Sequence, residues 1–149
     1  MYLFSYFNAI EFIYMFLLKN YWRSVLLFII IVFLSTINTN NLVTEEVQFF
    51  KHFDKFAHFA MYFSLSFVFF IENHKSSRPI RKRWIILDTI ILGILLEFIQ
   101  FLFTNYRTGN FYDAVFNTIG VLSGSALYFL LRNHRLVYKL MLFKSDYNK

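Results

Sequence analysis

The sequence contains no cysteine, which excludes disulfide bonds, thiolate chemistry and zinc sites with cysteine ligands. It is also poor in charge, because Asp, Glu, Lys and Arg make up only 16% of the residues. An average soluble domain has about a quarter of its residues charged. The chain is instead 58% hydrophobic and carries 22 phenylalanines. This composition over 149 residues indicates a single-domain integral membrane protein.

Several functional signatures are also missing. No basic segment precedes the first apolar stretch and no small-residue cleavage site follows it, so we expect no cleavable signal peptide. The chain shows no Ser-His-Asp order, no glycine-rich phosphate loop and no nucleic-acid footprint. The net charge of +6 comes from basic residues between the apolar runs, where they set membrane topology. We therefore expect no nucleic-acid partner.

The apolar runs predict an all-α fold, a bundle of four transmembrane helices at about residues 22–38, 53–71, 84–103 and 113–131. Ahead of them, residues 1–18 are rich in aromatic residues. Ser5, Asn8 and Glu11 recur there at every third position and form a narrow polar stripe. We favour a helix lying at the membrane interface over a fifth span, which would bury Glu11. The expected divisions are an interfacial helix (1–18), a membrane domain (22–131) and a basic cytoplasmic tail (132–149).

The basic residues predict the orientation of the spans. Of the 15 Lys and Arg residues, two precede the first span, five lie between the second and third, and five follow the fourth. Only three fall on the opposite side. The positive-inside rule therefore predicts that both termini are cytoplasmic.

In this orientation, polar residues from separate segments meet at the outer face. Helical spacing places them on three helix faces, while Arg107 lies in the last loop. With the glycines that share their helix faces, the residues are Asp54, Lys55 and His58; Gly93, Glu97 and Gln100; and Asp113, Asn117, Gly120 and Gly124. The glycines, at small-residue spacing, predict close helix packing.

Ionisable groups inside a span are costly, which favours a binding or catalytic pocket. The alternative is structural pairing, of Arg107 with Asp113 or Glu97 and of His58 with Asp54. One histidine with carboxylates lacks the two-histidine spacing of a hydrolytic zinc site. We therefore expect no metal and no cofactor.

These motifs resemble the VanZ-like family of small bacterial membrane proteins, named for a teicoplanin-resistance protein. The resemblance is carried over about residues 22–131 by Asp54-Lys55-x-x-His58, Tyr62, Glu97-x-x-Gln100 and Arg107-Thr-Gly-Asn-x-x-Asp113-x-x-x-Asn117. Residues 1–18 lie outside it. The resemblance implies a multi-pass protein of the bacterial cytoplasmic membrane that affects glycopeptide susceptibility.

Two functions follow as hypotheses. In the first, a pocket with Lys55, Gln100, Arg107, Asp113 and Asn117 binds a membrane lipid headgroup, a lipid-linked peptidoglycan precursor or a glycopeptide. In the second, the protein is an intramembrane hydrolase or transferase acting on a lipid-linked substrate. His58 would then be the general base, Asp54 would orient it, and Glu97 would act as a buried acid. The sequence does not predict an oligomeric state.

Overall fold

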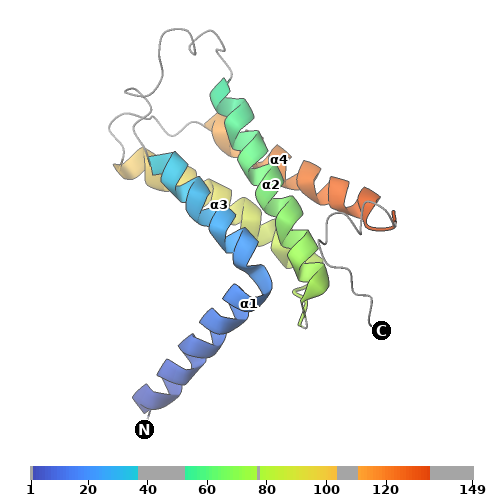
Figure 1. Ribbon diagram of the computed structural model, residues 1–149. Helices are drawn as coiled ribbons and strands as arrows, with labels where there is room; N and C mark the ends of the chain where they lie inside the picture. Colours follow the sequence, from blue (N-terminus) through green and yellow to red (C-terminus); the bar gives the residue numbers. More distant parts are fainter. Residues whose placement is uncertain (1, 37–52, 77, 104–110, 135–149) are drawn as a thin grey trace.

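The computed structural model describes residues 2–36, 53–76, 78–103 and 111–134. These residues form four helices and, within the described ranges, no strand (Figure 1). The helices are α1 (Tyr2–Thr36), α2 (Phe53–Lys75), α3 (Lys82–Phe103) and α4 (Phe111–Leu131). Each contains a segment long and apolar enough to cross a membrane. The expected all-α fold is confirmed for the described residues, with four helices long and apolar enough to span a membrane.

Successive helices run in alternating directions, so their ends gather at two poles of the bundle (Figure 1). One pole collects the last turns of α1 and α3 and the first turns of α2 and α4. We call it the site pole, because it holds the polar residues discussed below. The opposite pole holds the α2–α3 connection with Arg78, Arg81 and Lys82. Which pole faces the cytoplasm stays a prediction.

Helix α2 is the centre of the bundle and packs most extensively against α4. Two glycines of α4 permit this approach. A Cβ atom at Gly120 would lie only 2.5 Å from the backbone oxygen of Phe59, and one at Gly124 would overlap the backbone oxygen of Phe63. The two backbones therefore pack together without an intervening side chain, as small residues allow in membrane bundles.

Helix α1 is kinked at Tyr21, whose backbone angles (φ −133°, ψ 26°) are not helical. The Glu72 carboxylate accepts hydrogen bonds from the backbone N–H groups of Arg23 and Ser24 and from the Ser24 hydroxyl. These are the free donors of a new helix start, so Glu72 caps the second half of α1. The sequence predicts a boundary between a surface helix and the first span at this place. The structure breaks α1 at this place, and its candidate span is Met15–Thr36. The interfacial position of the first half stays a prediction.

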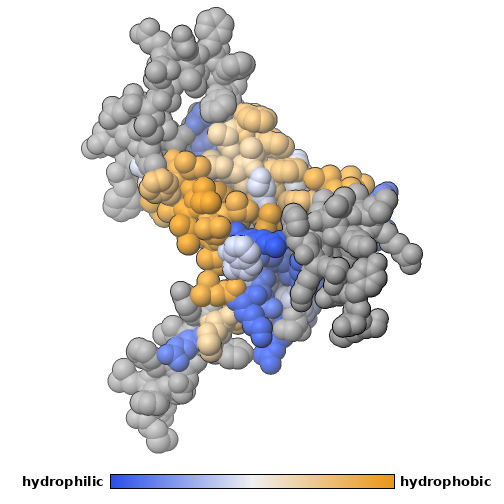
Figure 2. All heavy atoms as spheres, viewed as in Figure 1, coloured by the Kyte–Doolittle hydropathy of each residue, from blue (hydrophilic) through white to orange (hydrophobic). Residues whose placement is uncertain are grey.

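The buried core is small, as expected for a bundle that lies in lipid. One cluster joins all four helices through Ile31, Tyr62, Leu65, Leu96 and Val121. Many large apolar side chains are exposed instead, and Figure 2 shows hydrophobic residues over much of the bundle above a hydrophilic patch. An exposed apolar surface of this extent fits contact with lipid tails.

Candidate functional site

The site pole is organised around His58, whose side chain is buried among α2, α3 and α4. Its Nδ1 atom lies 3.0 Å from Asn117 Oδ1 and 3.2 Å from Glu97 Oε1. Asn117 Nδ2 donates in turn to Glu97 Oε1 at 3.2 Å. One histidine, one amide and one carboxylate from three helices thus form a buried network. Such a network satisfies polar groups that would otherwise be costly to bury.

The network determines which nitrogen of His58 carries the donated proton. The Glu97 carboxylate only accepts, so Asn117 must direct its NH₂ group towards it. Asn117 then presents its oxygen to His58, and Nδ1 of His58 donates to that oxygen. In the neutral imidazole this tautomer leaves a lone pair on Nε2.

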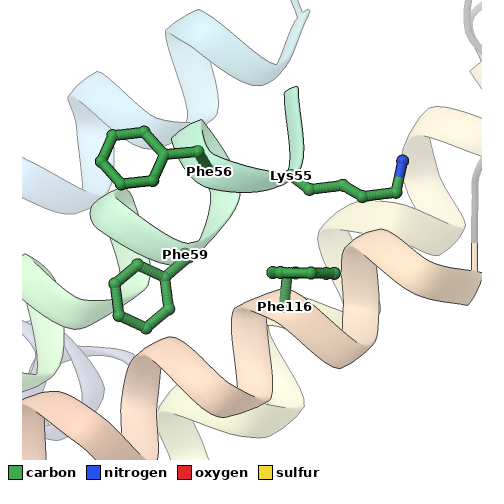
Figure 3. A pocket seen from close by; sticks show the side chains of 4 residues that line it. All are labelled: Lys55, Phe56, Phe59 and Phe116. Atoms are coloured by element: carbon green, nitrogen blue, oxygen red, sulfur yellow. The ribbon is translucent and has the colours of Figure 1, made fainter. Parts of the chain in front are cut away.

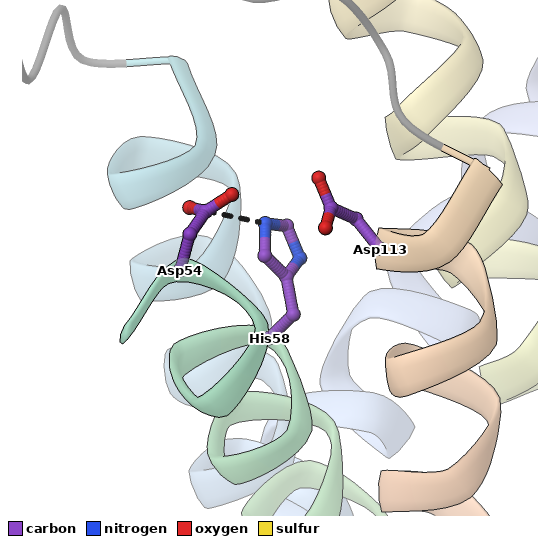
Figure 4. A group of neighbouring side chains, drawn as sticks. All are labelled: Asp54, His58 and Asp113. Atoms are coloured by element: carbon purple, nitrogen blue, oxygen red, sulfur yellow. Dashed lines mark ion pairs between the residues drawn. The ribbon is translucent and has the colours of Figure 1, made fainter. Parts of the chain in front are cut away.

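Two more carboxylates lie on either side of the His58 ring (Figure 4), and Asp54 is the one near Nε2. Asp54, one helical turn earlier, has its Oδ1 atom 3.8 Å from Nε2, and Asp113 of α4 faces the same ring (Figure 4). Asp113 is buried, whereas the Asp54 side chain is 46% exposed. Nε2 has no hydrogen-bond partner among the described residues. Both carboxylates lie in the first turns of their helices, where the helix dipole stabilises negative charge.

Other residues of the predicted site connect helices. Gln100 Nε2 donates to the backbone oxygen of Ser35 at 2.8 Å, which ties α3 to the end of α1. A Cβ atom at Gly93 would lie 3.1 Å from the ring of Tyr62, so Gly93 gives this ring its space. The structure therefore places Gln100 and Gly93 on the packed face of α3, together with Glu97.

Lys55 lies beside this network and borders an open pocket of about 550 Å³. The other lining residues are Phe56 and Phe59 of α2 and Phe116 of α4 (Figure 3). Lys55 precedes His58 by three residues and Phe116 follows Asp113 by three, a spacing that makes neighbours on a helix surface. The apolar pocket and the polar network are therefore adjacent.

Among the predicted site residues, the structure brings together Asp54, His58, Glu97, Asp113 and Asn117. Arg107 lies outside the described residues. Glu97 and Asn117 contact Nδ1 of His58 while Asp54 lies near Nε2, and the roles expected for the carboxylates stay predictions. In the structure, Glu97 is thus placed to orient the imidazole.

Sequence reasoning missed a second polar cluster, at the opposite pole. Tyr21 donates its hydroxyl proton to Asn73 Oδ1, which also accepts from the backbone N–H of Ile80. Together with the Glu72 cap on Ser24, these bonds join α1, α2 and the α2–α3 connection. Glu72 and Asn73 lie far from Ser24 and Tyr21 in the sequence, so no local motif predicts these contacts. The aromatic pocket was also missed. In a chain with 22 phenylalanines, no individual phenylalanine stands out from the sequence as a site residue.

Comparison with known proteins identifies one family. The model of the VanZ/LLP1 family matches residues 2–132, which is most of the chain. The resemblance expected from the motifs is confirmed, and the match also includes the N-terminal segment that those motifs left outside. No curated protein and no solved structure matches the chain.

Proposed function

The chain belongs to the VanZ/LLP1 family, and we propose that it binds the headgroup of an anionic membrane lipid or a lipid-linked cell-wall precursor at its site pole. The observation that carries this proposal is the pocket between α2 and α4, where three phenylalanines and one lysine meet. Hydrocarbon fits the phenylalanine surface, and the Lys55 ammonium attracts a phosphate or carboxylate.

The aromatic surface continues along α2 beyond the pocket. The rings of Phe56, Phe59, Phe63 and Phe67 follow one another at centroid separations of 6.5, 5.8 and 6.2 Å. This row runs from the site pole towards the middle of the bundle. A lipid chain that starts at Lys55 therefore has a continuous apolar track to follow.

The family and the orientation suggest the setting. We place the protein in the bacterial cytoplasmic membrane with both termini in the cytoplasm, so that the site pole faces outwards. Lipid-linked peptidoglycan precursors are exposed on that side. Binding them would alter how a glycopeptide such as teicoplanin reaches its target.

The experiment is identification of co-purified lipid. The full chain is purified in mild detergent from bacterial membranes, and its bound lipids are quantified by native mass spectrometry. We expect an anionic lipid enriched at least tenfold over its share of the membrane, and loss of that enrichment in Lys55→Gln. Lys75→Gln removes the same charge at the opposite end of α2 and serves as the matched control.

The outcome also decides the ligand class. A polyprenyl-linked species would identify a cell-wall precursor, whereas an anionic phospholipid would identify a general headgroup site. If wild type carries lipid in the same proportions as the membrane, or if both lysine variants behave alike, the binding proposal fails.

A second function, an intramembrane hydrolase or transferase, is favoured by the orientation of His58. Its Nδ1 is held by Asn117 and Glu97, and its Nε2 is left to accept a proton. That is the arrangement of a general base with an orienting partner. Incubation with the co-purified lipid distinguishes the two functions. Release of the headgroup that stops in His58→Ala supports an enzyme, and an unchanged lipid supports a binding protein.

A further inference from the structure

The side chains of Asp54, His58 and Asp113 converge at the site pole in a way that the lipid proposal does not use. One ligating atom from each, two carboxylate oxygens and one imidazole nitrogen, lies within 4.8 Å of the other two. Figure 4 shows the imidazole of α2 between the two carboxylates, with Asp54 from its own helix and Asp113 from α4. Two separate helices thus supply three groups of the kind that bind metals.

His58 gives an independent indication of a cation. Its side chain is 2% exposed, and its Nε2 atom has no hydrogen-bond partner in the described part of the chain. Because Nδ1 donates to Asn117, the neutral ring carries its lone pair on Nε2, 3.8 Å from the Asp54 carboxylate. A lone pair and a carboxylate oxygen are both groups that a metal cation binds.

The separation of Nε2 and Asp54 is longer than a direct hydrogen bond between them. A protonated Nε2 would donate to Asp54 at about 2.7–2.9 Å, whereas the observed separation is 3.8 Å. Ligands of a tetrahedral ion with bonds of about 2.1 Å lie about 3.4 Å from one another. Asp54 is half exposed, so its side chain can rotate towards that separation from Nε2.

The order of contacts around the ring is also that of metal-binding histidines. Such a histidine usually donates its second N–H to a carboxylate, carbonyl or similar acceptor, which fixes the ring and raises its basicity. Here Asn117 and Glu97 supply that support to Nδ1. These contacts fix the ring in the way that a metal-binding histidine requires.

We propose that Asp54, His58 and Asp113 form a binding site for one divalent transition-metal ion. A ligand set of one imidazole and two carboxylates suits Zn²⁺ or Mn²⁺ better than Mg²⁺ or Ca²⁺, which prefer oxygen alone. The three protein ligands leave coordination positions for water or for an anionic group. The site does not depend on lipid binding, although a bound ion would add positive charge beside Lys55.

The test is metal binding by the intact chain, purified with a tag that contains no histidine. The protein is stripped with a chelator, dialysed against micromolar Zn²⁺ or Mn²⁺, and its metal content is measured by plasma mass spectrometry. Affinity is measured by competition with a chromophoric chelator. We expect a single ion per chain and a dissociation constant raised at least tenfold in Asp54→Asn, Asp113→Asn and His58→Gln.

Asp54→Asn carries the most weight, because a half-exposed carboxylate can be neutralised without disturbing the core. Asp88→Asn, which neutralises an exposed acid of α3, is the matched control and should bind like wild type. Wild type should also unfold at a higher temperature when the ion is added, and Asp54→Asn should not. Absence of bound metal in wild type, or binding that Asp54→Asn and Asp113→Asn leave unchanged, would overturn the proposal. Equal loss in Asp88→Asn would overturn it as well.

Discussion

At the scale of single residues, the site pole depends on which groups surround the two ring nitrogens of His58. The i, i+4 spacing correctly puts Asp54 and His58 on one face of α2, at an ion-pair distance of 3.8 Å. It does not reveal that Nδ1 of His58 turns to Asn117, 59 residues away. That pairing depends on how α2 and α4 cross, and no local pattern encodes a crossing.

Asn117 is the residue on which the buried network depends. Its replacement by alanine leaves Nδ1 of His58 with Glu97 alone and removes a hydrogen bond to Glu97. We expect Asn117→Ala to lower the free energy of unfolding by about 1–2 kcal/mol, the scale of polar contacts in membrane bundles. Thermal unfolding in detergent measures the change, with the exposed Asn133→Ala as control. Equal stability of the two variants would show that the network contributes nothing.

At the scale of helices, the lengths and order of the spans follow from hydropathy, because an apolar run of about 20 residues matches the hydrocarbon thickness. The structure agrees closely for α3 and α4, which begin at Lys82 and Phe111. It differs for α1, where the break at Tyr21 is set by Glu72 of another helix. Glu72 lies 48 residues from Ser24, the residue that it caps, so the sequence around Ser24 contains no capping signal.

The crossing of α2 and α4 depends on glycine, so Gly120→Ala tests it. The added methyl group would meet the backbone oxygen of Phe59, which cannot rotate away as a side chain could. We expect α2 to be displaced and unfolding to become easier by about 1–3 kcal/mol, as for other overpacked contacts. Thermal unfolding in detergent again provides the measurement.

Ala126→Val enlarges an exposed position of the same helix and should be tolerated. The crossing would be looser than described if Gly120→Ala were equally harmless.

At the scale of the whole molecule, the orientation in the membrane determines whether the site pole faces the outside of the cell or the cytoplasm. The side it faces determines which ligands can reach the site. The absence of cysteine makes this accessible to experiment, because a single introduced cysteine is the only thiol. We expect a membrane-impermeant maleimide to label Phe111→Cys at the site pole of intact cells. It should label Pro79→Cys and Asn133→Cys, at the opposite pole, only after lysis. The reverse pattern would place the site pole in the cytoplasm.

The convergence of separate helix ends was foreseeable from the sequence, because polar residues of three spans that alternate in direction fall at one depth. The neighbouring pocket was not, since its walls come from Phe56, Phe59 and Phe116 in a chain with many phenylalanines. The proposed function depends on the two features being adjacent. A probe placed within the pocket therefore tests the proposed function where the pocket adjoins the polar network.

The most direct measurement is lipid photo-crosslinking from inside the pocket. A benzophenone amino acid is placed at Phe116, and in a separate chain at Leu130, an exposed position near the other end of α4. After irradiation of native membranes, the adducts are identified by mass spectrometry. The account predicts that position 116 captures mainly an anionic or polyprenyl-linked lipid, while position 130 captures lipids in their bulk proportions. The same bulk mixture at both positions would contradict it.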